Sequence, residues 1–225
     1  LVEGLDGVRR MGHGMWVDWI ATIGRKELEQ GIKNLESEAF WMSGEDIVRR
    51  WEEVDMQLDS EDGGVRRDTV CVPACVLPHS FAVLFNTCSA VHQVVDPPLG
   101  SDTLHLLATK LAVETVEAYE KMPPSVLRHS DQLCVQLAFD LDFTMDVLAG
   151  HEAQGLEQRV ERVRGAITGG VDPIDLSFLA PLLETARKRA YHRASVVMGP
   201  LVQLKRLHTR APASLPSLPK PINIP

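Results

Sequence analysis

Three cysteines and a histidine are the residues best suited by type and spacing to bind a metal ion. Cys71, Cys75 and His79 follow one another with three residues between neighbours, and Cys88 lies further along. Thiolates and imidazoles can hold zinc in a tetrahedral site. Structural zinc sites usually contain tighter pairs of cysteines, however, and the apolar residues between these positions favour ordinary buried thiols. We therefore predict no metal site, and a zinc-stabilised helical domain remains an alternative.

Three nearby carboxylates have residue types that can do acid–base chemistry. Asp140, Asp142 and Asp146 lie close together, and the last two share a helix face at positions i and i+4. Paired carboxylates can act as general acid and base, but this pattern is also typical of the solvent-exposed face of a half-buried helix. No nucleophile elbow, phosphate-binding loop or dinucleotide-binding glycine motif accompanies them. The sequence predicts no catalytic residue, no cofactor and no enzymatic activity.

Positive charge is densest near the C-terminus. The residues concerned are Arg187, Lys188, Arg189, His192, Arg193, Lys205, Arg206 and Arg210. Such a cluster can bind anionic lipid head groups or an acidic partner helix. The simpler interpretation is a solvated helix face with Glu184 and Lys188 as an i, i+4 pair. A peripheral membrane protein that binds through residues 187–193 is thus a further alternative, whereas the net charge of −8 disfavours nucleic acid as a partner.

Composition favours helices as the elements that position these side chains. Hydrophobic residues make up 44% of the 225 residues and aromatic residues only 5%, which suits helices packed through leucine, alanine and valine. No apolar run approaches the roughly 20 residues that span a bilayer. Four cysteines in a chain of this size indicate reduced thiols in the cytosol. No signal peptide is visible, and the first residue, Leu1, suggests a piece of a longer protein.

The N-terminal third is predicted to hold two helices and an extended segment. Apolar residues recur at helical spacing over residues 15–34, although Gly24 and Gly31 weaken that helix. A second helix is predicted to begin at Ser43 and to include Trp51 and Val54. Residues 59–68 are expected to form a loop, and residues 69–76, which contain Pro73, an extended segment or edge strand. The tryptophans of this region are interpreted as packing anchors.

The remaining chain is predicted to be a series of helices bounded by glycine and proline. Ser101 and Asp172 are candidate N-caps, and Pro181 is expected to divide a short helical turn from the long helix that follows it. The predicted helices are residues 80–95, 102–122, 130–149, 153–167 and 182–198. Five prolines from Pro212 onward predict a disordered tail.

The expected fold class is therefore all-α, a helical bundle or rod of antiparallel helices with a short extended segment and a disordered, proline-rich tail. We predict an N-terminal helical segment over residues 1–60 that continues from an upstream region, a helical bundle over residues 69–208, and the tail over residues 209–225.

A series of short motifs resembles one family of membrane-trafficking proteins. In chain order the motifs are Val72-Pro73-Ala74, Leu84-Phe85-Asn86-Thr87-Cys88, Val116-Glu117-Ala118-Tyr119-Glu120-Lys121, Gln136-Leu137-Ala138-Phe139-Asp140-Leu141 and Asp172-Pro173-Ile174-Asp175-Leu176. Their order and spacing over residues 69–205 resemble the C-terminal region of subunit 1 of the conserved oligomeric Golgi complex. The N-terminal 60 residues and the tail carry no such motif.

The resemblance implies a non-catalytic scaffold subunit of a multisubunit vesicle-tethering complex. Such complexes are built from helical rods at the cytosolic face of the Golgi membrane and support retrograde transport within the Golgi. The implied partners are other subunits, with SNAREs, small GTPases and coiled-coil tethers reached through the assembled complex. Membrane association would be peripheral and through partners, with no cofactor. Other helical-rod tethers, such as the exocyst or the Golgi-associated retrograde protein complex, are alternatives.

A scaffold subunit must present apolar helix faces to its neighbours. The candidate partner-binding residues are Phe139, Phe143, Leu176, Phe178, Leu179 and Leu183. The competing interpretation is that these side chains fill the core of their own bundle.

Overall fold

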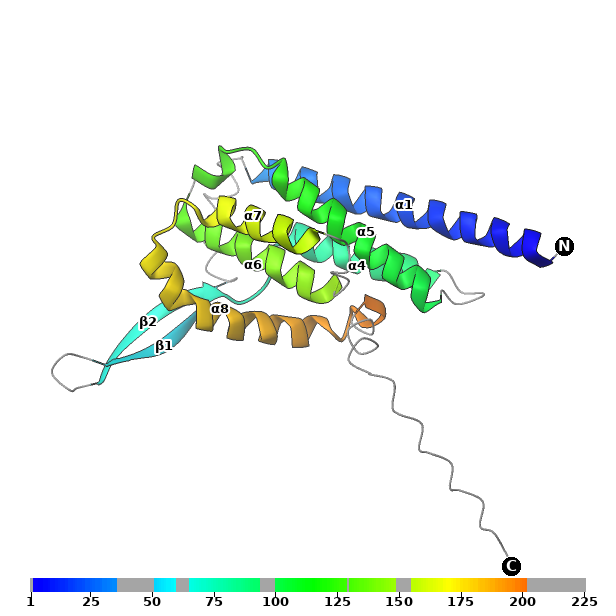
Figure 1. The fold of residues 1–225 in the computed structure, drawn as a ribbon. Helices are drawn as coiled ribbons and strands as arrows, with labels where there is room; N and C mark the ends of the chain where they lie inside the picture. The colour runs from blue at the N-terminus through cyan, green and yellow to red at the C-terminus, as the bar shows by residue number, and fades with distance from the viewer. Residues whose placement is uncertain are drawn as a thin grey trace, which may run out of the picture.

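The computed structural model describes residues 2–35, 51–59, 65–93, 100–128, 130–148 and 155–201. Within these ranges the chain forms a helical bundle with one small sheet, as Figure 1 shows, and this confirms the predicted all-α class. The helices are α1 (Val2–Asn34), α4 (Pro78–Gln93), α5 (Ser101–Glu120), η1 (Val126–Arg128), α6 (Asp131–Leu148), α7 (Leu156–Thr168) and α8 (Pro173–Ala194). The predicted helices match α4, α5, α6 and α7 to within a few residues at each end, whereas α1 and α8 begin earlier than expected and η1 was not predicted.

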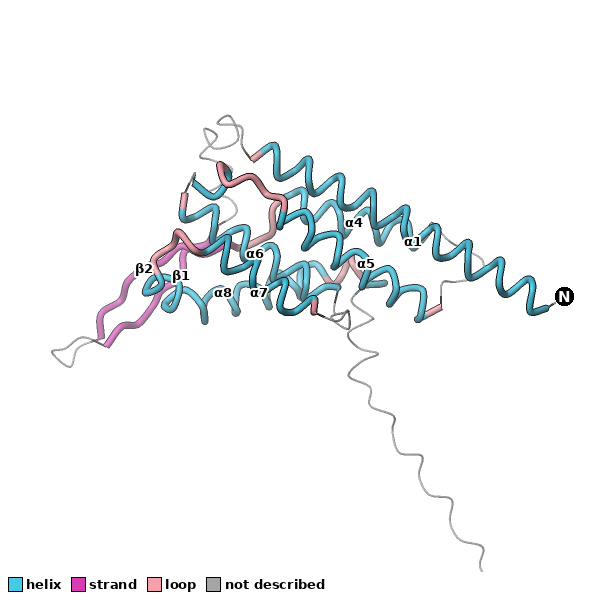
Figure 2. Tube along the Cα trace, turned by 45° about the horizontal axis from the view of Figure 1, so that its top comes forward, coloured by secondary structure: helices cyan, strands magenta, loops and turns pink. Residues whose placement is uncertain are grey.

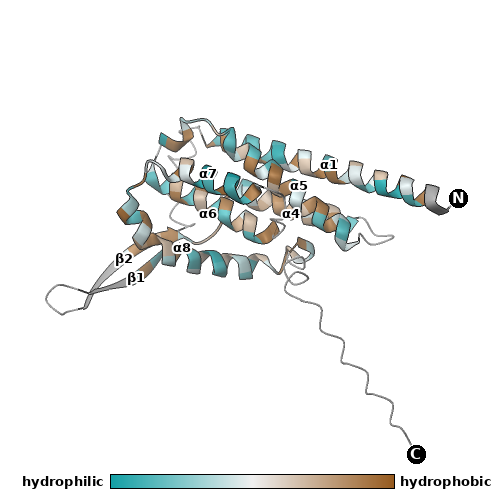
Figure 3. Cartoon of the chain, viewed as in Figure 1, coloured by the Kyte–Doolittle hydropathy of each residue, from teal (hydrophilic) through white to brown (hydrophobic). Residues whose placement is uncertain are grey.

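The helices are arranged around α6. It contacts α4, α5, α7 and α8, whereas α1 packs on α4 and α5. Helices α1 and α8 therefore lie on opposite sides of the bundle, as Figures 1 and 2 both show. Figure 3 shows hydrophobic residues concentrated on α4, α5 and α6 and hydrophilic residues along much of α8. The core is thus centred on α4, α5 and α6, and α1, α7 and α8 cover it from the outside.

A two-stranded hairpin replaces part of the second helix predicted from the sequence. Strand β1 (Trp51–Asp59) pairs antiparallel with β2 (Val65–Pro73), in a register that places Trp51 opposite Pro73. The helical prediction for Trp51 and Val54 was wrong, because pairing between the strands outweighs a short helical pattern. Residues 36–50, which include Ser43, lie outside the described residues. Residues 69–73 of the predicted extended segment 69–76 form the second half of β2. The predicted loop over residues 59–68 was wrong at both ends, because Asp59 ends β1 and β2 begins at Val65.

Two glycines of α1 allow its close approach to neighbouring helices. A Cβ atom at Gly31 would lie 2.4 Å from Cβ of His79, and one at Gly24 would lie 2.8 Å from Cδ1 of Leu111. Such separations are far below van der Waals contact, so the missing side chains permit the packing of α1 against α4 and α5. The glycines that weakened the helical pattern in the sequence are therefore explained by tertiary packing.

Of the two candidate N-caps, Asp172 is confirmed and Ser101 is not, and Ser130, which was not predicted as a cap, also accepts an amide hydrogen bond at the start of α6. The side chain of Asp172 accepts a hydrogen bond from the Ile174 amide (2.8 Å), and Ser130 Oγ accepts one from the Leu133 amide (3.1 Å). Ser101 is not an N-cap, because Gly100 occupies the cap position with an extended backbone and Ser101 is the first residue of the helix. Its hydroxyl donates to Asp102 instead.

Pro181 does not divide α8, contrary to the prediction. The helix runs without interruption from Pro173 to Ala194. A proline removes the amide that would bond the carbonyl of Ser177, but both residues are exposed, so water can solvate the freed carbonyl. The helix also ends earlier than the expected residue 198. The tail over residues 209–225 lies outside the described residues, and the proposed domain boundaries stay predictions.

Candidate partner-binding groove

The candidate zinc ligands are scattered rather than gathered. Cys71 lies on β2 and is exposed, as is Cys75, whereas Cys88 is buried on α4. Burial raises the pKa of Cys88 to about 11, which keeps a thiol rather than a metal-binding thiolate. Among the residues that the structure describes, no three histidine, cysteine, aspartate or glutamate side chains come close enough to share a metal ion.

Asp140 is fully buried and holds the start of a neighbouring helix. Its Oδ2 accepts hydrogen bonds from the backbone amide of Leu77 (2.9 Å) and from Ser80 Oγ (3.0 Å), at the N-terminus of α4. Its Oδ1 accepts one from Gln136 Nε2 (2.8 Å), which also donates to the carbonyl of Cys75 (3.0 Å). A carboxylate at a helix N-terminus satisfies free amides and interacts favourably with the helix dipole. Asp140 therefore has a structural role in joining α6 to α4.

Asp142 and Asp146 form ion pairs with two neighbouring helices. Arg164 of α7 and Arg187 of α8 both pair with the carboxylate of Asp142, and Arg187 pairs with Asp146 as well (2.8 Å). Burial raises the pKa of Asp142, and the two guanidinium groups oppose that rise. The predicted i, i+4 face of α6 thus binds arginines from two helices and fixes α7 and α8 to the bundle.

The basic residues of α8 are mostly paired within the chain. Besides Arg187, Lys188 pairs with Glu184 as the sequence predicted, and Arg189 pairs with Glu52 of β1. Arg193 donates to the carbonyl of Ala74 (3.4 Å). These pairings leave little unpaired positive charge in the run 187–193, which weakens the lipid-binding alternative. Lys205, Arg206 and Arg210 lie outside the described residues.

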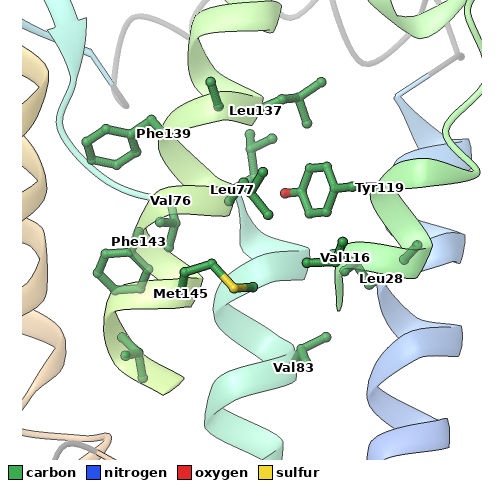
Figure 4. Close-up of a cluster of buried hydrophobic side chains, with 14 of the residues drawn as sticks. Leu28, Val76, Leu77, Val83, Val116, Tyr119, Leu137, Phe139, Phe143 and Met145 are labelled. Atoms are coloured by element: carbon green, nitrogen blue, oxygen red, sulfur yellow. The ribbon is translucent and has the colours of Figure 1, made fainter. Parts of the chain in front are cut away.

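Phe139 and Phe143 belong to the core. Their exposed fractions are 3% and 1%, and Figure 4 shows both rings among buried side chains such as Val76 and Met145. At these exposures both rings pack mainly against side chains of this chain. The structure therefore assigns these two of the candidate partner-binding residues to their own bundle.

The candidate residues on α8 have a different environment. Phe178 is 50% exposed, and Leu176, Leu179 and Leu183 are half-buried. The fully packed residues of this helix are small and lie in its second half, at positions Ala186, Ala190 and Ala194. The large apolar side chains of the first half of α8 are thus only partly covered by the bundle.

A groove runs beside this half-covered part of α8. It has a volume of about 460 Å³ and lies between α8, the start of α6 and the hairpin. Phe178, Leu179 and Leu182 form one wall, Val135 of α6 lies beside them, and Trp51 of β1 contributes an indole. The remaining lining residues are Thr69, Val70, Cys71, Asp131, Gln132, Val171 and Asp175. We call this feature the α8 groove. A mainly apolar groove with few polar groups is suited to binding apolar side chains.

A second cavity, of about 450 Å³, lies on the other flank of α8. It is bounded by Leu176 and Leu183 of α8, by Phe139 of α6 and by the paired Arg164 and Arg187. The two cavities divide the predicted α8 residues between them. The second has internal ion pairs at its wall, so the α8 groove is the better candidate for partner contact.

The sequence analysis missed the part of the groove that the hairpin supplies. A signal was present, because Val54, Met56 and Leu58 alternate with polar residues, and this period of two is typical of a strand. The Asp62-Gly63 pair that follows is a common hairpin turn, although it lies outside the described residues. Ile174, which is 64% exposed and lies one turn before Phe178 on α8, was also missed.

Comparison with known proteins gives two related matches. The chain is 26% identical to human conserved oligomeric Golgi complex subunit 1 and 24% identical to the mouse protein of the same name, over 162 residues in each case. The matches cover 66% of this chain but only 16% of each relative. No family model matches, and no solved structure does.

The chain thus spans about a sixth of the length of these relatives. Both matches have the name that the motif series indicated. In the part of the chain that the structure describes, no helix is both long and apolar enough to cross a bilayer. The comparisons therefore confirm the resemblance of this chain to subunit 1 of the conserved oligomeric Golgi complex.

Proposed function

We propose that this chain is a non-catalytic scaffold region of a Golgi vesicle-tethering complex that acts through protein–protein contacts. The observation that carries the proposal is the similarity to subunit 1 of the conserved oligomeric Golgi complex from human and mouse. The proposed partners are other subunits of such a complex, with SNAREs, small GTPases and coiled-coil tethers reached through the assembly. The proposed site of action is the cytosolic face of the Golgi membrane, in retrograde transport within the Golgi, with peripheral attachment through partners.

The arrangement of polar groups supports a scaffold rather than an enzyme. The buried carboxylate of Asp140 is used to cap α4, and those of Asp142 and Asp146 hold arginines of α7 and α8. The α8 groove is lined mainly by apolar side chains, which suits binding of a protein surface. These features favour partner contact as the role of the exposed apolar residues.

The test is native co-purification of the tagged chain from cytosol, followed by mass spectrometry. We expect subunits of the conserved oligomeric Golgi complex to be enriched together. Enrichment of exocyst subunits, or of the Golgi-associated retrograde protein complex, would replace the proposed assembly with another helical-rod tether. Recovery of the chain without any tethering subunit would contradict the proposal.

A further inference from the structure

We propose that the α8 groove binds an amphipathic helix of a partner protein, with lysines or arginines flanking its apolar face. This inference rests on the proposed function, because a scaffold region needs a surface for its neighbours, and it specifies the chemistry of one such neighbour. It is carried by three features of the described residues: an exposed apolar ridge, an adjoining apolar groove, and acidic side chains at its edge.

The exposed ridge has the spacing that a partner helix requires. Ile174, Phe178 and Leu182 lie at positions i, i+4 and i+8 on α8; 64% of Ile174 and 50% of Phe178 are exposed, and Leu182 is half-buried. At 1.5 Å per residue this ridge extends about 12 Å along the helix. The α8 groove lies beside it and offers room for a few apolar side chains. A helix that lies along a groove inserts side chains at intervals of three and four residues, which matches this geometry.

The charge around the groove indicates which residues should flank the apolar face of the partner helix. Both charged residues in its lining are acidic, namely Asp131 in the first turn of α6 and Asp175 in the first turn of α8. Neither forms an ion pair with another described residue, whereas Arg189 of α8 is already paired with Glu52. The exposed Glu53 of β1 adds negative charge to the nearby strand. A positively charged partner complements this edge, and a second copy of this chain, with its net charge of −8, does not.

The experiment is isothermal titration of the full 225-residue chain with two designed helical peptides. Both probes are capped, roughly 18 residues long, and have leucine at helical spacing on one face. One has lysine on the flanks and the other has glutamate at the same positions. We expect saturable one-to-one binding of the lysine probe and binding at least about tenfold weaker for the glutamate probe. Equal affinity for the two probes would overturn the proposal.

Two matched variants locate the site. Phe178→Asp is expected to weaken binding of the lysine probe at least about tenfold, because it places a charge in the apolar wall. Leu106→Asp adds the same charge to α5, at a leucine that is 52% exposed and outside the groove lining. The affinity of this control variant for the lysine probe should change by less than about twofold. Equal loss in both variants, or none in Phe178→Asp, would show that the probe binds elsewhere or only through net charge, and would overturn the proposal.

The outcome can be separated from that of the proposed function. Co-purification of tethering subunits by a chain that does not discriminate between the probes would reject the groove and leave the scaffold proposal standing. Selective binding of the lysine probe without co-purification of tethering subunits would support the groove and reject the Golgi assignment. Dimerisation of the chain that is abolished by Phe178→Asp would identify a second copy as the occupant and reject the basic partner helix.

Discussion

Helices α6 and α8 have similar apolar residues but different surroundings. Every leucine and phenylalanine of α6 is buried, because α4, α5, α7 and α8 all contact this helix. The main contacts of α8 are with α6 and β2, and its buried residues are three alanines. A phenylalanine at helical spacing is therefore a core residue in one helix and a surface residue in the other. The number of covering elements, not hydrophobicity, separates core from candidate interface.

The largest effect on stability is expected from truncation of Phe143, an aromatic side chain of α6 that lies in the core. Phe143→Ala should lower the free energy of unfolding by about 3–5 kcal/mol, because it removes a fully buried ring and leaves a cavity. Phe178→Ala on α8 should lower it by less than about 1 kcal/mol, since half of that ring is already exposed. Urea denaturation followed by circular dichroism gives both values. Similar losses in the two variants would remove the contrast between the helices.

The second largest effect on stability is expected at Asp140, a buried polar residue of α6. Asp140→Ala should cost about 3 kcal/mol, because the Leu77 amide and the Gln136 side chain lose a buried, charged acceptor. Asp131→Ala, at the exposed start of the same helix, should cost less than about 1 kcal/mol. Urea denaturation measures the change in the free energy of unfolding for each variant. Hydrogen exchange of the Leu77 amide should accelerate only in Asp140→Ala. An unchanged exchange rate in that variant would contradict the assigned cap.

The same contrast between covered and uncovered surface exists within α1. Gly31→Ala should destabilise the fold by about 2 kcal/mol through overpacking, because the new methyl group would overlap the base of the His79 side chain. Gly7→Ala should stabilise it by about 0.5–1 kcal/mol, since no atom lies within 4 Å and alanine favours helix. Thermal denaturation of the pair provides the comparison. A stabilised Gly31→Ala variant would show that α1 does not pack this closely on α4.

The smallest effect on stability is expected from deprotonation of Cys88 at alkaline pH. Burial raises the pKa of Cys88 from 9.0 to about 11, so the unfolded chain loses this proton first and the folded chain keeps it. Stability is therefore complete below pH 9 and should fall by about 1 kcal/mol at pH 10 from this group alone. Burial also raises the pKa of Tyr119, which adds to the loss at still higher pH. Cys88→Ala should reduce the fall between pH 9 and 10, and an unchanged pH profile would contradict burial of this thiol.

Most helices were predictable because their signals are local. Spacing of apolar residues, the Asp172-Pro173 start and glycine or proline at the ends depend on the nearby sequence alone. The hairpin was missed at Trp51 and Val54 because strand pairing with β2 is a long-range contact, and the short segment also fits a helical pattern. The continuity of α8 through Pro181 was missed because solvent exposure decides what the lost hydrogen bond costs.

The candidate site was only partly predictable for a related reason. The sequence selected Phe143 and Phe178 together, because both are aromatic residues on amphipathic helices. The hydrophobic effect has no direction, so it cannot indicate which helix is covered on all sides. The α8 groove itself depends on Trp51, which is far from α8 in sequence, and on small alanines that hold the second half of α8 close to the bundle.

The most direct test of the contrast between the two helices introduces the same charge at each phenylalanine. The account predicts that Phe143→Asp abolishes the cooperative urea transition, whereas Phe178→Asp keeps a cooperative transition, with a loss of at most about 2 kcal/mol, and no longer co-purifies its tethering partner. Both variants are compared with the unmodified chain for folding and for recovered subunits. An unfolded Phe178→Asp variant, or a folded one that recovers every subunit, would contradict the assignment of the α8 groove as the partner-binding surface.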